Sequence, residues 1–252
     1  MADASAGDIV TAASLVIGDE ILSGRTKDKN IGHIAETMTA IGVDVREVRV
    51  VADVEAEIVT ALNALRARYT HVFTTGGIGP THDDITADAV AKAFGVAIDV
   101  DPRAVEMLLE RIPKADLNEA RLRMARIPAG ATLIANSVSK APGFSIGNVH
   151  VMAGVPNIMQ AMLAALAPTL KTGKAVLSRS IPAGLKEGDI AAPYGAVQRQ
   201  FPDVGMGSYP NFQEGVGFTT TLVLRARNEE RLDAAEAAVK AMLETVRAQS
   251  AR

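Results

Sequence analysis

A glycine-rich segment between Thr74 and Thr86, TTGGIGPTHDDIT, carries the residues of this chain that are best suited to chemistry. It follows a short apolar run and precedes a stretch with helical periodicity. Glycine allows positive φ angles and close approach of the backbone, so Gly76, Gly77 and Gly79 can turn their N–H groups toward a phosphate. The segment is therefore predicted to bind phosphate at the start of a helix. Replacing Gly77 by valine is expected to weaken this binding and to leave the fold largely intact.

Two acids follow the glycines. Thr75, Pro80 and Thr81 frame the turn, and Asp83 and Asp84 come directly before the predicted helix. Carboxylates beside a bound phosphate repel it unless a divalent cation lies between them. We therefore expect a divalent metal, Mg²⁺ in particular, with Asp83 and Asp84 as ligands. The alternative is that both acids only stabilise the dipole of the first helical turn.

Two further polar loops follow the first apolar strand. Gly18 and Asp19 end that strand, and Asp28 and Asn30 precede the next predicted helix. Ligands of an open α/β sheet bind beyond the carboxyl ends of its strands, so these residues are expected to share one crevice with the glycine-rich segment. An Asp or Asn before a helix commonly serves only as its N-cap, and this alternative stays open for Asp28 and Asn30.

A third glycine turn, Gly154-Val155-Pro156, follows a later apolar strand and opens a helix. Gly154 and Pro156 are expected at the same sheet edge, although such a turn is also an ordinary strand-to-helix connection. Lys140 lies in a loop and could meet a ligand phosphate, whereas a lone lysine is usually solvated. The histidines lack the spacing of metal ligands and are assigned no chemistry: His33, His71, His82 and His150.

Strands and helices alternate along the part of the chain that carries these loops. Apolar runs predict strands, and apolar residues at helical spacing predict the helices between them. The predicted strands are 14–17, 43–51, 71–74, 132–135 and 149–153. The predicted helices are 31–41, 55–68, 85–94, 103–111, 118–126 and 157–166. This alternation implies a largely parallel sheet with helices on both faces.

A segment rich in Pro, Thr, Lys and Gly at 168–173 marks a domain boundary. Residues 1–172 are predicted to form a three-layer α/β/α domain with a mostly parallel sheet. Residues 173–252 are predicted to form a small βαββα domain of the α+β class. Its elements are a strand at 175–181, a helix at 188–200, strands at 204–208 and 216–225, and a helix at 229–247.

Composition limits the classes of protein. Of the 252 residues, 48% are apolar and 22% are charged, and no apolar run approaches the length that crosses a bilayer. The first ten residues contain Asp3 and Asp8 and no basic residue, so we expect a cytoplasmic protein with no membrane partner. A net charge of −3 and the absence of Trp argue against a nucleic-acid partner. The absence of Cys excludes disulfides, thiolate metal sites and cysteine nucleophiles.

Together these motifs resemble the MoaB/Mog-like molybdopterin-binding domain family. The resemblance is to the branch with the amino-terminal part of competence/damage-inducible protein A (CinA) and the molybdopterin-binding-like domain of eukaryotic FAD synthase. It covers about Ser14 to Leu166 and continues into the second domain. It is carried by GDEIL at 18–22 with Gly24, DKN at 28–30, the segment 74–86, APGF at 141–144, GVP at 154–156 and, for the FAD synthase type, GSYP at 207–210.

The resemblance implies a crevice that binds a small-molecule nucleotide or pterin phosphate. In members that act on molybdopterin, acids at the positions of Asp28 and Asp84, or its neighbour, assist adenylyl transfer through Mg²⁺. The CinA and FAD synthase branch is associated with hydrolysis of ADP-ribose or FAD. We therefore predict a Mg²⁺-dependent nucleotide pyrophosphatase with Asp28, Asp83 and Asp84 as catalytic residues, in a homo-oligomer as in relatives. The alternatives are a molybdopterin-binding protein of molybdenum cofactor metabolism and a non-catalytic ligand-binding module.

The chain departs from the CinA pattern in three respects. Asn157 follows Gly-Val-Pro, where that branch has an acid soon after, and this keeps the non-catalytic alternative open. Ser139 and Lys140 replace the usual Gly-Thr before Ala-Pro-Gly. We also expect a stand-alone form, without the amidase domain of CinA or the nucleotidyltransferase domain of FAD synthase.

Overall fold

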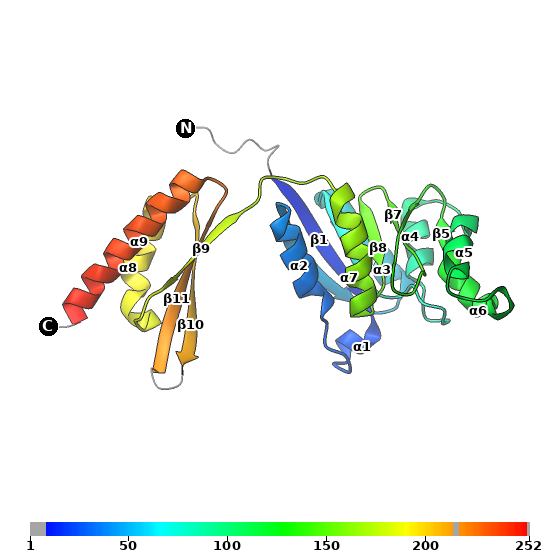
Figure 1. Ribbon diagram of the computed structural model, residues 1–252, viewed down its shortest axis with the longest axis horizontal. Coiled ribbons are helices and arrows are strands. Elements are labelled where there is room, and N and C mark those ends of the chain that lie inside the picture. Colours follow the sequence, from blue (N-terminus) through cyan, green and yellow to red (C-terminus); the bar gives the residue numbers. More distant parts are fainter. Residues whose placement is uncertain (1–8, 214–216, 251–252) are drawn as a thin grey trace. The chain divides into compact units, whose positions relative to one another are not determined.

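The structure is a computed structural model that describes residues 9–213 and 217–250. It divides into two compact units, Met1–Gly173 and Lys174–Arg252 (Figure 1). Within the described ranges, no helix is long and apolar enough to cross a membrane.

The first unit is built on a six-stranded sheet with the order β2-β1-β3-β8-β7-β6. Strands β2, β1, β3 and β8 are parallel, whereas β7 and β6 are antiparallel to their neighbours. Only Gly147 and Asn148 join β7 to β8, and so short a turn permits only an antiparallel pair. The strands are β1 (Val10–Ile17), β2 (Val43–Val51), β3 (His71–Thr75), β6 (Thr132–Ile134), β7 (Gly143–Ile146) and β8 (Val149–Met152).

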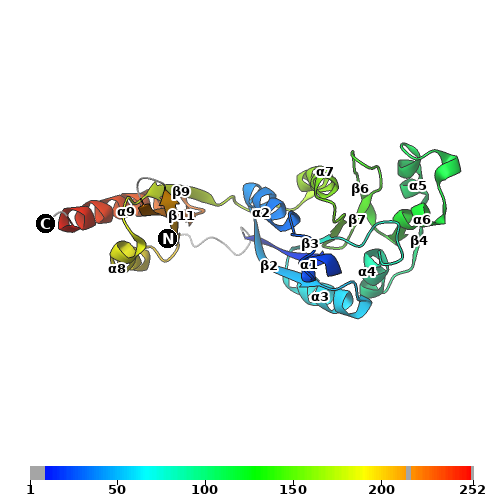
Figure 2. The ribbon, with the colours of Figure 1, turned by 90° about the horizontal axis from the view of Figure 1, so that it is seen from below.

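Helices cover both faces of this sheet, which confirms the predicted three-layer α/β fold (Figure 2). Ile34 of α2 and Met159 of α7 pack with Phe73 on one face. Leu62 of α3 and Val90 of α4 pack with Leu15 on the other. The helices are α1 (Asp19–Leu22), α2 (Asn30–Ala40), α3 (Glu55–Arg68), α4 (Thr86–Phe94), α5 (Pro102–Leu109), α6 (Glu119–Leu122) and α7 (Pro156–Leu166). Shorter elements are β4 (Ile98–Val100), β5 (Arg126–Pro128) and the 3₁₀ turns η2 (Lys114–Asp116), η3 (Arg123–Ala125) and η4 (Ala167–Thr169).

The structure differs from the predicted elements in three places. The helix predicted over 118–126 is present as α6 and the 3₁₀ turn η3, and it ends before Arg126, which begins β5 and pairs with β4. Strands β4, β5 and β7 were not predicted. The sequence analysis also gave no helix at Asp19 and Glu20, which begin α1.

The second unit has the predicted βαββα order: β9 (Leu177–Pro182), α8 (Glu187–Gln200), β10 (Gly205–Gln213), β11 (Gly217–Ala226) and α9 (Glu229–Ser250). Its antiparallel sheet has the order β10-β11-β9. Leu222 and Leu224 of β11 pack with Ile190 of α8 and Val239 of α9. Strand β10 continues beyond the predicted end at 208, so the tract 207–210 lies within a strand. The predicted start of β11 at Val216 lies outside the described residues.

Candidate functional site

The loops that follow β3 and β8 meet the start of α2 at the carboxyl ends of the parallel strands. The Gly76 N–H donates to the Met152 carbonyl at 3.2 Å. Asn30 is 4% exposed, and its Nδ2 donates to the Gly154 carbonyl at 2.8 Å. A Cβ atom on Gly154 would lie only 3.2 Å from the Gly76 Cα atom. The structure therefore brings the glycine-rich segment, the third glycine turn and Asn30 into one continuous surface, and Pro156 lies in the first turn of α7 beside it.

Gly76 and Gly77 are required by the turn itself. Their φ angles are 103° and 65°, in the region that favours glycine. A Cβ atom on Gly77 would lie 2.2 Å from the Thr86 Oγ1 atom. Thr86 is buried, and its hydroxyl donates to the Gly76 carbonyl at 2.9 Å. The expectation that Gly77→Val leaves the fold largely intact is therefore wrong, because the added side chain overlaps a buried, hydrogen-bonded threonine.

The next backbone groups of this turn remain available to a ligand. The N–H groups of Gly77, Ile78 and Gly79 donate to no atom of residues 9–213 or 217–250. Three successive free N–H groups in a turn can converge on an anion. The Gly76 N–H is already used by the sheet and cannot serve this purpose. Phosphate binding by this loop stays a prediction, with Gly77 to Gly79 as its donors.

Asp84 and Asp28 use their carboxylates to hold backbone. Asp84 Oδ2 accepts from the Thr81 N–H at 2.8 Å and from the Thr81 hydroxyl at 2.6 Å. Asp28 Oδ1 accepts from the N–H groups of Asn30 and Ile31 at 3.0 and 2.8 Å, so it caps α2. The capping alternative for Asp28 thus describes its observed contacts. Catalytic roles for both acids stay predictions.

Asp83 belongs to a different set of carboxylates. The Thr81 hydroxyl lies near it and lowers its pKa. Burial raises the pKa of Asp53, which follows β2, and the nearby negative charges of Asp19, Glu20 and Asp83 raise it further. The Asp19 N–H donates to Asp53 Oδ2 at 2.9 Å. The acids that follow β1 and β2 therefore lie near enough to Asp83 for its charge to act on Asp53.

The acids of the glycine-rich segment do not form a complete site for a divalent metal by themselves. The described part of the chain contains no group of three or more His, Cys, Asp or Glu side chains that could hold a metal ion. Mg²⁺ in phosphate sites is commonly held by one or two carboxylates together with substrate phosphates and water. The side chains therefore fit Mg²⁺ only if the phosphate of a ligand completes its coordination.

The different contacts of the two aspartates predict different effects on stability. Asp84→Ala removes the acceptor of two hydrogen bonds from Thr81 and is expected to lower the free energy of unfolding by about 1–2 kcal/mol. Asp83→Ala is expected to leave it unchanged, because Asp83 is exposed. Urea unfolding followed by circular dichroism measures both, and equal losses in the two variants would contradict this assignment.

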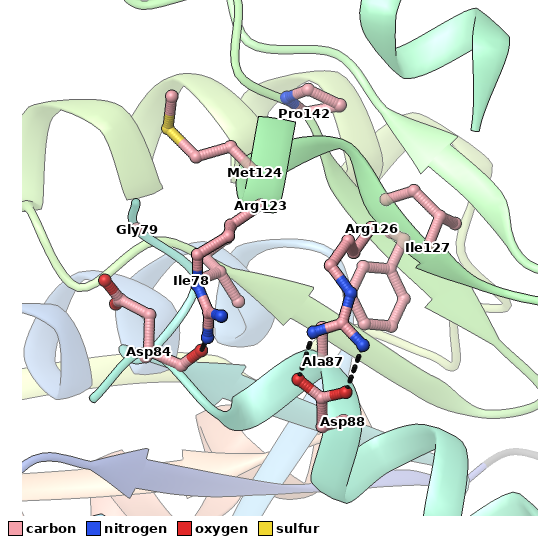
Figure 3. A pocket seen from close by; sticks show the side chains of 12 residues that line it. Ile78, Gly79, Asp84, Ala87, Asp88, Arg123, Met124, Arg126, Ile127 and Pro142 are labelled. Carbon is pink, nitrogen blue, oxygen red and sulfur yellow. Dashed lines mark hydrogen bonds and ion pairs between the residues drawn. The ribbon is translucent and has the colours of Figure 1, made fainter. Parts of the chain in front are cut away.

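A pocket lies beside the glycine-rich segment, on the side toward β7 (Figure 3). Its lining includes Gly77, Gly79 and four charged side chains, Asp84, Asp88, Arg123 and Arg126. Lys140, predicted as a possible phosphate ligand, is paired with Glu110 at 2.6 Å and does not line this pocket.

The sequence analysis missed Asp53 and Arg123. Asp53 follows the end of a strand that neighbours β1, so the position of strand ends alone could have identified it. Arg123 lies in the irregular stretch between α6 and β5, and no local pattern distinguished it from the other arginines nearby.

The histidines His71 and His150 are not isolated, although 79 residues separate them. His71 Nδ1 lies 3.1 Å from His150 Nε2, and His150 Nδ1 lies 2.8 Å from the Ser145 hydroxyl. His71 Nε2 lies 2.9 Å from the Lys171 carbonyl, which can only accept. With both rings neutral, protons therefore point in one direction, from Ser145 to Lys171. This series of hydrogen bonds lies near the amino end of β3, away from the glycine loops.

Two family models match the chain. Residues 13–172 match the family described as "Probable molybdopterin binding domain", and residues 175–251 match "FAD synthase, middle domain". A protein of Pyrobaculum calidifontis is 36% identical over 217 residues, which cover 79% of this chain and 80% of that protein. A protein of Saccharolobus islandicus is 39% identical over 159 residues, and the match spans 60% of each chain. Neither relative's name states an activity.

One solved structure is similar in both fold and sequence. It is the crystal structure described as "the protein CinA with unknown function from Thermoplasma acidophilum". Its TM-score is 0.61 at 36% identity, and the match covers 64% of this chain and 98% of that one. The similarity therefore spans the part of the fold that contains the glycine loops.

Proposed function

Because the chain belongs to the molybdopterin-binding domain family, with a CinA/MoaB-type first unit, we propose that its crevice hydrolyses the diphosphate of a nucleotide such as ADP-ribose or FAD. The observation that carries the proposal is the run of three free backbone N–H groups, those of Gly77, Ile78 and Gly79, in the loop that also carries Asp83. The match of residues 175–251 to the middle domain of FAD synthase favours a nucleotide over a pterin.

The proposed reaction adds water across one P–O–P bond. Water attacks one phosphorus atom, the bridging oxygen leaves with the other phosphate, and two phosphomonoesters result. The backbone N–H groups of Gly77 to Gly79 bind a non-bridging phosphate oxygen and orient the diphosphate. In the proposed reaction Asp83 and Asp53 accept a hydrogen bond from the attacking water. Asp28 and Asp84 hold the backbone that faces the ligand, and this is how they act in the proposed reaction.

The divalent metal enters this proposal together with the ligand. Mg²⁺ bound there would neutralise charge on the phosphate oxygens. Asp83 would hold it, with ligand phosphate and water completing its coordination. Asp84 contributes less than the sequence suggested, because Thr81 occupies one of its carboxylate oxygens twice.

A substrate panel tests the proposed function. Purified protein is incubated with MgCl₂ and ADP-ribose, FAD, NAD or molybdopterin, and the release of AMP is measured by chromatography. We expect hydrolysis of at least one nucleotide, loss of it with EDTA, and a decrease of about 100-fold or more in Asp83→Asn. Asp116→Asn, which changes an exposed acid outside the crevice, serves as the control with the same change of charge.

Other results of the panel would favour the alternatives. Binding of molybdopterin without hydrolysis of any diphosphate would overturn the proposal and support a pterin-binding protein. Tight nucleotide binding without turnover would support a non-catalytic module, as the Asn157 departure allows. We also propose a homo-oligomer, which size-exclusion chromatography with light scattering would detect.

A further inference from the structure

We propose that Arg123 is the cationic residue that binds a ligand phosphate in this crevice, on the β7 side of the glycine-rich segment. The inference rests on the proposed function, because it places the phosphate of the same ligand. It adds a specificity-determining side chain to a loop whose other donors are backbone groups. It also requires no metal for this part of binding.

The guanidinium of Arg123 is poorly satisfied by the protein. In Figure 3 it extends from η3 toward the backbone carbonyl of Asp84, between Ile78 and the Asp84 residue. Its Nη2 donates to that carbonyl at 3.3 Å, which is a long hydrogen bond. Its Nε is buried and has no hydrogen-bond partner in the described structure. No carboxylate of residues 9–213 or 217–250 forms an ion pair with it.

The other cations near this pocket are neutralised. Arg126 makes two hydrogen bonds to Asp88, at 2.7 and 2.6 Å, and Figure 3 shows both. Lys140 is paired with Glu110. Arg123 therefore supplies positive charge that the described side chains around the pocket leave without a counterion.

A phosphate matches the donors that Arg123 leaves free. These donors are Nε, Nη1 and the second N–H of Nη2, whose first N–H donates to the Asp84 carbonyl. The planar guanidinium can use two such donors to bind two phosphate oxygens at once. A buried donor without an acceptor is costly, so a small rotation of the side chain toward an anion is favourable. Gly77 and Gly79, whose N–H groups are free, line the same pocket. Backbone and side-chain donors therefore converge on one small anionic group.

The crevice consequently carries negative charge on one side of the loop that follows β3 and positive charge on the other. Asp19 and Asp53 follow the ends of β1 and β2, and the negative charges of Asp19 and Asp83 both raise the pKa of Asp53. The Arg123 pocket includes Pro142 and Phe144, at the start of β7. Because β1 and β7 lie on opposite sides of β3 in the sheet, acids and arginine flank the loop from opposite sides. A ligand phosphate is drawn toward Arg123, and a second phosphate on the acidic side needs a cation.

This arrangement predicts binding that survives removal of the metal. Titration calorimetry compares wild type, Arg123→Gln and Arg123→Lys, with ADP-ribose as the probe, in MgCl₂ and in EDTA. In both buffers Arg123→Gln is expected to weaken binding by about 10- to 100-fold. Arg123→Lys keeps the positive charge but lacks the planar guanidinium, and its affinity for ADP-ribose is expected to lie between those of wild type and Arg123→Gln. Arg121→Gln, which lies outside the pocket lining, changes the charge equally and is expected to bind like wild type.

Two further measurements separate phosphate binding from general damage. Adenosine, which lacks phosphate, is expected to bind all four proteins alike. Thermal unfolding shows whether Arg123→Gln is folded, and if it is not, the Arg123→Lys comparison decides. Equal affinity of wild type and both Arg123 variants for ADP-ribose would overturn the inference and leave the proposed function standing. If wild type binds a pterin phosphate instead of a nucleotide, the same variants must weaken that binding. If wild type binds no phosphate ligand, both proposals fail.

Discussion

Gly76→Ala is expected to lower the free energy of unfolding of the first unit by about 3 kcal/mol or more. The φ angle of 103° is costly for any residue with a side chain. The added Cβ atom would lie 2.1 Å from the Ile17 carbonyl oxygen, which is part of the central strand β1. The backbone of Gly76 is also fixed, because its N–H donates to the Met152 carbonyl. Neither side of this contact can move without disturbing the sheet.

Gly24→Ala is the matched control for Gly76→Ala. Gly24 has a φ of 73°, and no heavy atom lies within 4 Å of the position of its Cβ. We expect a loss of only about 1 kcal/mol there, from the backbone conformation alone. Amide hydrogen exchange of β3 during urea unfolding reports on the first unit separately from the second. Equal losses in the two variants would show that the contact with Ile17 is unimportant.

Because Gly76 is needed for the fold of this loop, loss of ligand binding in a Gly76 variant has two possible causes. A variant of Gly76 that fails to bind ligand has lost the turn, so it says nothing about contact with a phosphate. Substitutions at Arg123 and Asp83 reduce this problem, because neither residue has the positive φ angle of the turn and Arg123 contributes only one long hydrogen bond, to the Asp84 carbonyl. They are therefore the informative variants for ligand binding.

The first unit is expected to lose on the order of 4–5 kcal/mol of stability at His150 as the pH falls from about 6.5 to about 3. Burial, together with a smaller effect of the neighbouring His71, lowers the pKa of His150 to about 3. Burial also lowers the pKa of His71. The folded state therefore binds fewer protons than the unfolded state in this window. The contribution of neutral His150 to stability is fully present above the pKa that histidine has in the unfolded chain, about 6.5, and it decreases as the pH falls below that value.

Protonation of a buried histidine has a desolvation cost, and it also disrupts the hydrogen bonds of the pair. A charged His71 places an N–H on Nδ1, where it faces the N–H of His150 at 3.1 Å. A charged His150 places an N–H on Nδ1, where the Ser145 hydroxyl must then turn and accept. Because both rings are buried, water cannot replace these partners.

Urea unfolding between pH 7.5 and 4.5 tests this expectation above the range in which most carboxylates titrate. Wild type is expected to lose stability at about 1.4 kcal/mol per pH unit below pH 6.5 for each histidine that stays neutral when folded. His150→Gln is expected to be less stable at pH 7.5 and to have a shallower pH dependence. His33→Gln, on α2, should keep the wild-type slope. An unchanged slope in His150→Gln would contradict the role of this buried pair.

Much of the framework was determined by local sequence. The alternation of β1, α2, β2, α3, β3 and α4 was predicted because apolar periodicity depends on neighbouring residues. The order of the second unit followed for the same reason. The glycine-rich segment could also be placed after its strand, since positive φ angles and helix starts are local properties.

The tertiary structure decided which groups meet. The sequence suggested that Asp83 and Asp84 act together, but Thr81 holds the carboxylate of Asp84, while the charge of Asp83 acts on Asp53, which follows another strand. It gave no reason to join His71 to His150, or to single out Arg123 from its neighbours. Burial, hydrogen-bond partners and unneutralised charge arise from packing between distant segments. Adjacent residues in a sequence can therefore have different chemistry, and distant ones can share it.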